Sequence, residues 1–112
     1  MSITTHILDI ANGRPATGVT VILEMRQAGE WSPIGRGVTD EDGRLATLTE
    51  GRPVTPGTYR LTFDIGEYQR DHGISVPFFP VATITFNVRD VSDDYHVPLL
   101  LSPYGYSTYR GS

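Results

Sequence analysis

Apolar and polar residues alternate along much of this chain, and this period of two constrains the fold more than any other feature of the sequence. Residues 58–65 place apolar side chains on one face and polar side chains on the other, and residues 19–26 and 81–88 repeat the pattern. Such a period is typical of a half-buried β-strand. The apolar faces comprise Tyr59, Leu61, Phe63 and Ile65, then Val19, Val21, Leu23 and Met25, then Ala82, Ile84, Phe86 and Val88.

Turn signals separate the segments at short intervals. Only residues 66–73 (GEYQRDHG) indicate a helix, which ends with Gly73 as a C-cap and joins two strands. Short, regularly spaced strands are typical of a sandwich or barrel, and 112 residues suit one domain. We therefore expect a single all-β domain over residues 1–112. The turn pairs are Asn12-Gly13, Ala28-Gly29, Asp42-Gly43 and Pro56-Gly57.

The two end segments differ from the others because both of their faces carry apolar residues. In residues 3–10 and 94–102, leucine or isoleucine occurs on each face, and His6 and His96 fall on the faces that point away from the core. A strand that is apolar on both sides is normally buried on both sides, so we expect a second subunit to cover the outer faces. Pro98 lacks an N–H, which predicts a bulge or a missing ladder bond there.

Composition excludes several classes of protein. The formal charge is −4 and the basic residues are scattered singly, so the basic stripe of a nucleic-acid-binding protein is missing. No apolar run approaches the roughly 20 residues that span a membrane. The chain contains no cysteine and can therefore form no disulfide. The N-terminal sequence lacks the features of a signal peptide, so we expect a cytoplasmic protein, or a periplasmic one if a signal peptide has been removed.

His6 and His96 are the side chains best suited to chemistry. A neutral imidazole in a partly desolvated groove between subunits can act as a general base at about pH 7, although an interface histidine with one hydrogen bond would give the same pattern. No HxH, HxxxH or HExxH spacing occurs, and His72 falls in the helical segment. Residues 40–43 (DEDG) are more typical of a turn than of a calcium loop. We therefore expect no metal and no cofactor. The sequence contains no GxSxG motif, so it gives no indication of a serine hydrolase.

Several motifs resemble those of one family. They are residues 5–19 (THILDIANGRPATGV), the DGR of residues 42–44, and residues 95–112 (YHVPLLLSPYGYSTYRGS). With these motifs the chain resembles the transthyretin-related 5-hydroxyisourate hydrolases along its whole length. The resemblance implies a transthyretin-like sandwich of two four-stranded sheets with one short helix, assembled as a homotetramer (a dimer of dimers). It also implies that the first strand and the last two share a sheet whose outer face lines a channel between dimers.

The same resemblance implies an enzyme of urate breakdown. The reaction would be hydrolysis of 5-hydroxyisourate to 2-oxo-4-hydroxy-4-carboxy-5-ureidoimidazoline, the opening of a ring amide. His6, Arg44 and His96 correspond to site residues of the family. On this interpretation the two histidines position and deprotonate a water, and Arg44 binds the carbonyls of the planar ring. Which histidine is the base stays open, as does whether a neighbouring subunit completes each site.

The last four residues match the most specific motif of the family, Tyr-Arg-Gly-Ser. The resemblance implies that Tyr109, together with Arg110 and Gly111, contributes to substrate binding. It assigns Ser112 to the catalytic group, where its hydroxyl or its terminal carboxylate would orient a histidine or the water. A covalent role for Ser112 is disfavoured because nothing near it in the sequence would activate it.

Two other functions have to be weighed against hydrolysis. One is a non-enzymatic, transthyretin-like small-molecule binding protein, although transthyretin lacks the histidine pair and the Tyr-Arg-Gly-Ser ending. The other is a structural immunoglobulin-like or adhesin module, for which strand alternation alone would be enough. That second alternative leaves the aromatic C-terminal segment unexplained.

Overall fold

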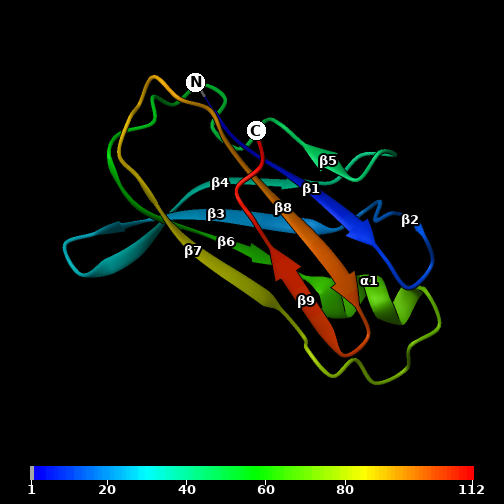
Figure 1. Ribbon diagram of the computed structural model, residues 1–112. Helices are drawn as coiled ribbons and strands as arrows, with labels where there is room; N and C mark the ends of the chain where they lie inside the picture. The colour runs from blue at the N-terminus through cyan, green and yellow to red at the C-terminus, as the bar shows by residue number, and fades with distance from the viewer. Residues whose placement is uncertain (1) are drawn as a thin grey trace.

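Two β-sheets pack face to face in the computed structural model, which describes residues 2–112 (Figure 1). The predicted all-β sandwich with one short helix is confirmed, and the first sheet has one more short strand, β5, than expected. The first sheet has the order β2-β1-β8-β9 (Arg14–Pro15, Ile3–Asp9, Tyr95–Ser102, Gly105–Thr108), and β5 (Arg44–Leu45) also pairs with β1. The second has the order β4-β3-β6-β7 (Glu30–Val38, Thr20–Gln27, Gly57–Phe63, Ala82–Val88).

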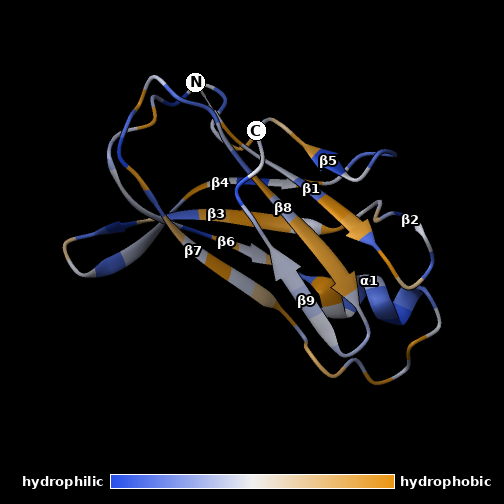
Figure 2. Cartoon of the chain, in the orientation of Figure 1, coloured by the Kyte–Doolittle hydropathy of each residue, from blue (hydrophilic) through white to orange (hydrophobic). Residues whose placement is uncertain are grey.

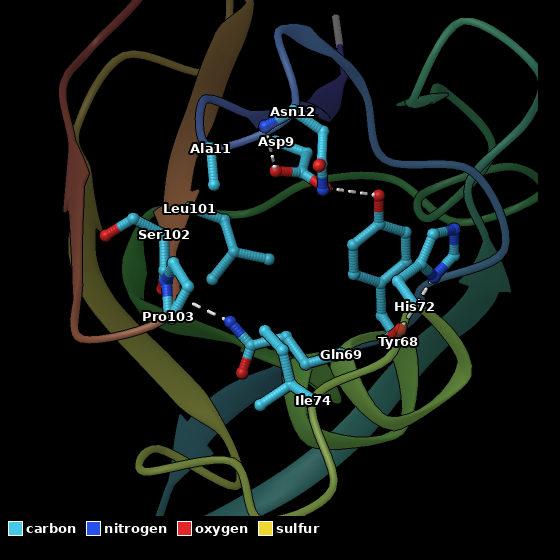
Figure 3. A pocket seen from close by; sticks show the side chains of 10 residues that line it. All are labelled: Asp9, Ala11, Asn12, Tyr68, Gln69, His72, Ile74, Leu101, Ser102 and Pro103. Atoms are coloured by element: carbon cyan, nitrogen blue, oxygen red, sulfur yellow. Dashed lines mark hydrogen bonds between the residues drawn. The ribbon is translucent and has the colours of Figure 1, made fainter.

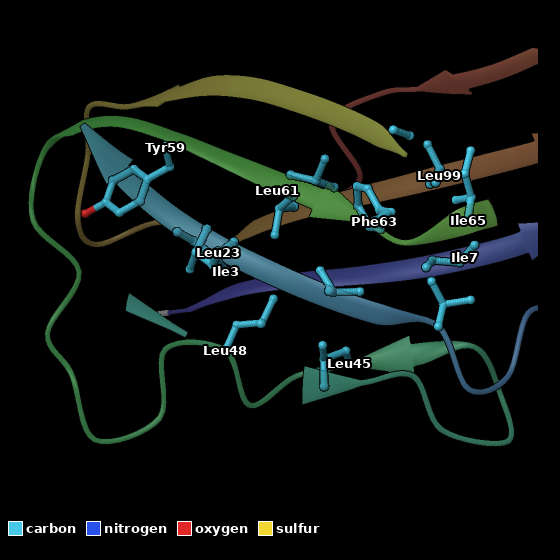
Figure 4. Packing of buried hydrophobic residues seen from close by; sticks show 14 of the residues in the cluster. Ile3, Ile7, Leu23, Leu45, Leu48, Tyr59, Leu61, Phe63, Ile65 and Leu99 are labelled. Atoms are coloured by element: carbon cyan, nitrogen blue, oxygen red, sulfur yellow. The ribbon is translucent and has the colours of Figure 1, made fainter. Parts of the chain in front are cut away.

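The core lies between the two sheets and is formed by the alternating apolar positions (Figure 4). Leu23 of β3, Leu61 of β6 and Leu99 of β8 are fully buried there. The apolar faces predicted for residues 19–26, 58–65 and 81–88 all point inward, with Met25, Ile84 and Phe86 only partly buried. Period-two patterning therefore locates the core correctly, as expected for strands buried on one face.

The helix α1 (Ile65–Asp71) connects β6 to β7, as predicted, but begins one residue earlier than the pattern indicated. The carboxylate of Asp64 caps its N-terminus by accepting a hydrogen bond from the Glu67 N–H. The C-cap is His72 rather than the predicted Gly73, which follows it with φ 95, the left-handed conformation that glycine tolerates best. In the part of the chain that the structure describes, no helix is long and apolar enough to cross a membrane.

The strand β4 was not predicted, because Pro33 and two glycines interrupt its alternation. Its pairing with β3 shifts register between Leu23 and Glu24, so the strand bulges close to Pro33. Gly35 is required by close packing, since a Cβ there would lie 2.0 Å from the Leu48 carbonyl oxygen. An edge strand with a bulge can accommodate these residues, whereas a central strand could not.

The end strands β1 and β8 lie side by side and parallel in the first sheet. Their outer faces carry Thr4, His6 and Leu8 on β1 and His96 and Leu100 on β8, all half-buried in the single chain. Figure 2 shows β8 as hydrophobic along most of its length, which agrees with the prediction that both faces are apolar.

Pro98 interrupts the hydrogen bonding of β8 with the C-terminal segment, although its register with β1 stays regular. The regular pairing of β8 with β9 ends where Leu99 lies opposite Thr108. On the other side of Pro98, a single bridge joins His96 to Gly111. The predicted missing bond is therefore found, without a bulge against β1. Both ends of the chain consequently lie beside the start of β8, as Figure 1 shows.

Candidate active site

His6 lies on the outer face of β1, between Thr4 and Leu8 in the alternation of that strand. Its Nε2 is 2.9 Å from the backbone carbonyl oxygen of Asp42. A carbonyl can only accept a hydrogen bond, so Nε2 carries the proton. In the neutral ring Nδ1 is then the nitrogen that can accept a proton.

Arg44 joins this face because β5 pairs with β1 in a register that places Arg44 beside His6. The preceding turn is held by the carboxylate of Asp40, which accepts hydrogen bonds from the N–H groups of Asp42 at 2.9 Å and Arg44 at 3.0 Å. Gly43 has φ 73, which the turn requires. The DEDG segment is therefore a tight turn that positions Arg44.

His96 lies on the adjacent strand β8, with Thr4 of β1 as its cross-strand neighbour. The hydroxyl oxygen of Thr4 is 2.8 Å from Nδ1 of the imidazole. Burial lowers the pKa of His96, and the positive charges of Arg44 and His6 lower it further. The imidazole therefore stays neutral, and able to accept a proton, to a lower pH than an exposed histidine.

The C-terminal segment returns to this histidine. The Gly111 N–H donates to the His96 carbonyl oxygen over 2.7 Å. A Cβ at position 111 would lie 2.6 Å from Cδ2 of the His96 ring, so a larger residue could not pass this close without displacing the imidazole. Ser112 follows directly and is exposed. The backbone thus places the last residue of the chain next to His96.

Arg110 is the predicted site residue that the structure does not bring to the histidines. Its guanidinium lies over the ring of Tyr95, 4.6 Å from the ring centre, and 3.6 Å from the carboxylate of Asp93. Tyr95 belongs to the core-facing side of β8, opposite His96. Tyr109 is 58% exposed and lines, with Arg110, a groove of about 260 Å³ between β7 and the C-terminal segment. A role of either side chain in substrate binding stays a prediction.

His72 lies apart from the outer-face group, in a small cavity of about 20 Å³ beside α1 (Figure 3). Its ring stacks on Tyr68 with 4.1 Å between centroids, and the Tyr68 hydroxyl donates to the buried carboxylate of Asp9 over 2.7 Å. Burial raises the pKa of Asp9, but hydrogen bonds from Asn12 and Tyr68 outweigh it and leave the pKa below its usual value. Burial, followed by the contact with Asp9, raises the pKa of Tyr68. These contacts fasten α1 to the end of β1.

Metal ligands do not gather at either place. Across residues 2–112 there is no cluster of three or more His, Asp or Glu side chains able to hold a metal ion. The outer-face group offers instead two imidazoles and a guanidinium, which can bind carbonyl groups and move protons.

Thr4 is the site residue that the sequence interpretation missed. Threonines are common in strands, so the residue type alone does not mark this one. Its position two residues before His6 places both side chains on one face of β1, and that alternation is the signal that could have identified it.

Fold and site together define a transthyretin-like β-sandwich with a polar site on the outer face of one sheet. Residues 3–111 match the HIUase/Transthyretin family. A 5-hydroxyisourate hydrolase from Caulobacter vibrioides is 47% identical in an alignment that covers 98% of this chain and 97% of that protein. The chain belongs to the HIUase/Transthyretin family.

Solved structures from both branches of the family are similar to this fold. The 5-hydroxyisourate hydrolase of Klebsiella pneumoniae has a TM-score of 0.85 and 40% identity, covering 99% of this chain and 98% of that one. Sea bream transthyretin in complex with thyroxine has a TM-score of 0.92 and 33% identity, covering 99% and 95%. Fold similarity alone therefore does not separate the two branches, whereas sequence identity is higher to the hydrolases.

Proposed function

We propose that this protein is an enzyme that hydrolyses 5-hydroxyisourate to 2-oxo-4-hydroxy-4-carboxy-5-ureidoimidazoline in urate breakdown. The observation that carries the proposal is the grouping of His6, Arg44 and His96 on one outer face, set by the pairing of β5 and β8 with β1. The relatives named as 5-hydroxyisourate hydrolases supply the substrate.

The reaction needs a water, a base and a group that stabilises the developing oxyanion. The water oxygen bonds to the carbonyl carbon of the ring amide while a histidine takes one of its protons. The C–N bond of the ring then breaks, and the leaving nitrogen takes a proton. Arg44 binds the carbonyl oxygens of the planar ring through its planar guanidinium. Ser112, next to His96, orients the water or the imidazole.

The proposed assembly is a homotetramer in which the outer faces of the first sheet meet. Half-buried Leu8 and Leu100 on this face support the proposal, since a solvent-facing sheet surface is usually polar. Each site would then lie between subunits, where neighbouring chains exclude water. Tyr109 and Arg110 could contribute to binding in that setting.

The alternative, a non-enzymatic binding protein, has support from the similarity to thyroxine-bound transthyretin. Against it stands the charged and hydrogen-bonding character of the outer face here. Two imidazoles and a guanidinium would be costly to bury under an apolar ligand without partners.

The test is to generate 5-hydroxyisourate with urate oxidase and to follow its decay by absorbance. We expect the protein to accelerate the decay, and the His6→Asn and His96→Asn variants to lower kcat by about a hundredfold or more, within the range of general acid–base catalysis. Decay at the spontaneous rate with the wild-type protein would refute the enzymatic proposal. Saturable thyroxine binding in that case would favour the alternative.

A further inference from the structure

We propose that Thr4 is a positioning residue that makes His96 the general base: its hydroxyl oxygen accepts a hydrogen bond from Nδ1–H and so leaves the lone pair of the neutral ring on Nε2. This inference rests on the proposed hydrolase function. It assigns a role to a side chain that the family motifs did not indicate, and it assigns the base to His96.

The contact is built into the sheet. Thr4 and His96 are cross-strand partners of the parallel β1–β8 pair, and both point to the outer face. The distance of 2.8 Å between Oγ1 and Nδ1 is that of a well-formed hydrogen bond. Both residues are half-buried, so water competes less for this bond than it would at an open surface.

The proposed direction of the hydrogen bond is the one that a base acting through Nε2 requires. A threonine hydroxyl can donate or accept, and a donated proton would leave Nε2 protonated and unable to take another. With Nδ1–H donating to Thr4, Nε2 is free in the neutral ring. The same hydrogen bond persists when Nε2 takes a proton from water, because Nδ1–H is unchanged in the imidazolium.

The opposite edge of the ring faces the C-terminal segment. Cδ2, which is bonded to Nε2, is the ring atom nearest to the Cβ that a side chain at position 111 would have. The next nearest ring atom is Cγ, so the C-terminal segment packs against the Cδ2–Cγ edge of the ring, across from Nδ1. Thr4 on one edge and the Gly111 backbone on the other fix the plane of the imidazole.

The charges around His96 favour its use as a neutral base. They are Arg44 on β5 and His6 on β1. Burial and the two cationic neighbours lower the pKa of His96. His6 donates its Nε2–H to the Asp42 carbonyl, so its free nitrogen is Nδ1, whereas the free nitrogen proposed for His96 is Nε2. Removing the Thr4 hydroxyl changes none of these charges.

The experiment compares Thr4→Val, which removes only the hydroxyl, with Thr4→Ser, which keeps it. Thr5→Val is the matched control, because the Thr5 hydroxyl donates to the Val97 carbonyl over 2.7 Å on the buried face of the same strand. Nitrogen-15 NMR of the histidine rings reports the tautomer, and steady-state kinetics with 5-hydroxyisourate report kcat and KM across pH. Thermal melting confirms that each variant is folded.

We expect Nδ1–H to predominate for His96 in the wild type and in Thr4→Ser, and a mixture of tautomers in Thr4→Val. In Thr4→Val kcat should fall by about tenfold with KM nearly unchanged, a part of the roughly 10²- to 10⁴-fold effect of general acid–base catalysis. Thr5→Val should melt at a lower temperature but keep the tautomer and kcat.

The wild-type His96 tautomer in Thr4→Val, or kcat within about twofold of wild type, would overturn the role of Thr4. So would a wild-type ring protonated at Nε2 rather than Nδ1. The NMR result does not depend on activity. A wild-type protein that fails to hydrolyse 5-hydroxyisourate would therefore refute the proposed function, while the spectra would still decide the direction of the hydrogen bond.

Discussion

The close approach of Gly111 to the His96 ring leaves no room for a side chain at position 111. An alanine at position 111 would put its Cβ 2.6 Å from Cδ2, so either the imidazole or the C-terminal segment must move. We expect Gly111→Ala to lower kcat by about ten- to a hundredfold, since small displacements of a catalytic group have effects of this size. The matched control is Gly105→Ala, whose Cβ would lie 3.7 Å from the Ser102 hydroxyl in ordinary contact. Equal activity of the two variants would show that the approach of Gly111 has no catalytic consequence.

The ionisation of His96 gives a second prediction at this scale. Burial and the charges of Arg44 and His6 should place its NMR titration midpoint below the ordinary histidine value of 6.5. In Arg44→Gln one cationic neighbour is lost, so the imidazolium becomes less unfavourable and the pKa should rise. Because burial is the largest cause and is unchanged, the rise should be partial. A midpoint that falls, or that stays the same in Arg44→Gln, would contradict the electrostatic coupling.

Much of the candidate site could be predicted residue by residue. Strand parity placed His6 and His96 on an outer face, and the Asp42-Gly43 turn indicated the position of Arg44. Parity could not show which cross-strand neighbour each histidine contacts, because register is a property of two strands. Thr4 was missed for that reason. The direction of the Arg110 side chain, toward Tyr95, likewise depends on how the C-terminal segment returns along β8.

At the scale of elements, the sequence predicted the strands that are buried on one face. It missed the short or bulged strands, whose formation depends on pairing with a neighbouring strand. In the strands β3, β6 and β7 apolar and polar residues alternate, so this alternation is enough to predict them. The two-residue strands β2 and β5 exist only because their backbones pair with β1. The strand β4 carries a bulge and close-packed glycines, which no local propensity encodes.

The anchor between α1 and β1 leads to a stability prediction. Tyr68→Phe removes the hydroxyl that donates to the buried Asp9 carboxylate, and should lower the free energy of unfolding by about 1–3 kcal/mol at pH 7. The folded-state pKa of Asp9 lies below its ordinary value of 3.8. The ionised carboxylate therefore stabilises the folded protein at pH values above the unfolded-state pKa. This stabilisation is lost as the pH falls through the folded-state pKa.

The difference between Tyr68→Phe and wild type should therefore shrink as the pH falls below about 4. Urea unfolding at neutral and acidic pH, at one protein concentration, measures it. Tyr104→Phe is the control, since Tyr104 is 81% exposed and its loss of a hydroxyl should change stability by no more than about 0.5 kcal/mol. A pH-independent effect of Tyr68→Phe would show that the hydroxyl acts through packing rather than through Asp9.

At the scale of the whole molecule, the proposed tetramer covers the outer face of the first sheet. Leu100 of β8 lies on this face beside Leu8 of β1, and Ile22 of β3 occupies a similar half-buried position on the outer face of the other sheet. If the proposed tetramer is formed through the first sheet only, Leu100→Glu should dissociate it, because an unpaired carboxylate buried at an interface costs several kcal/mol. Ile22→Glu should leave the assembly intact.

Sedimentation at micromolar concentration distinguishes these outcomes, and activity with 5-hydroxyisourate should follow the assembly. We expect Leu100→Glu to form smaller species with kcat/KM reduced by about a hundredfold or more, since each site then opens to water. Ile22→Glu should sediment as a tetramer with nearly wild-type activity. A fully active small species would show that His6, Arg44 and His96 of one chain suffice for the reaction. Dissociation by Ile22→Glu would instead place the subunit contact on the second sheet, and the histidine pair would then lie on an open surface.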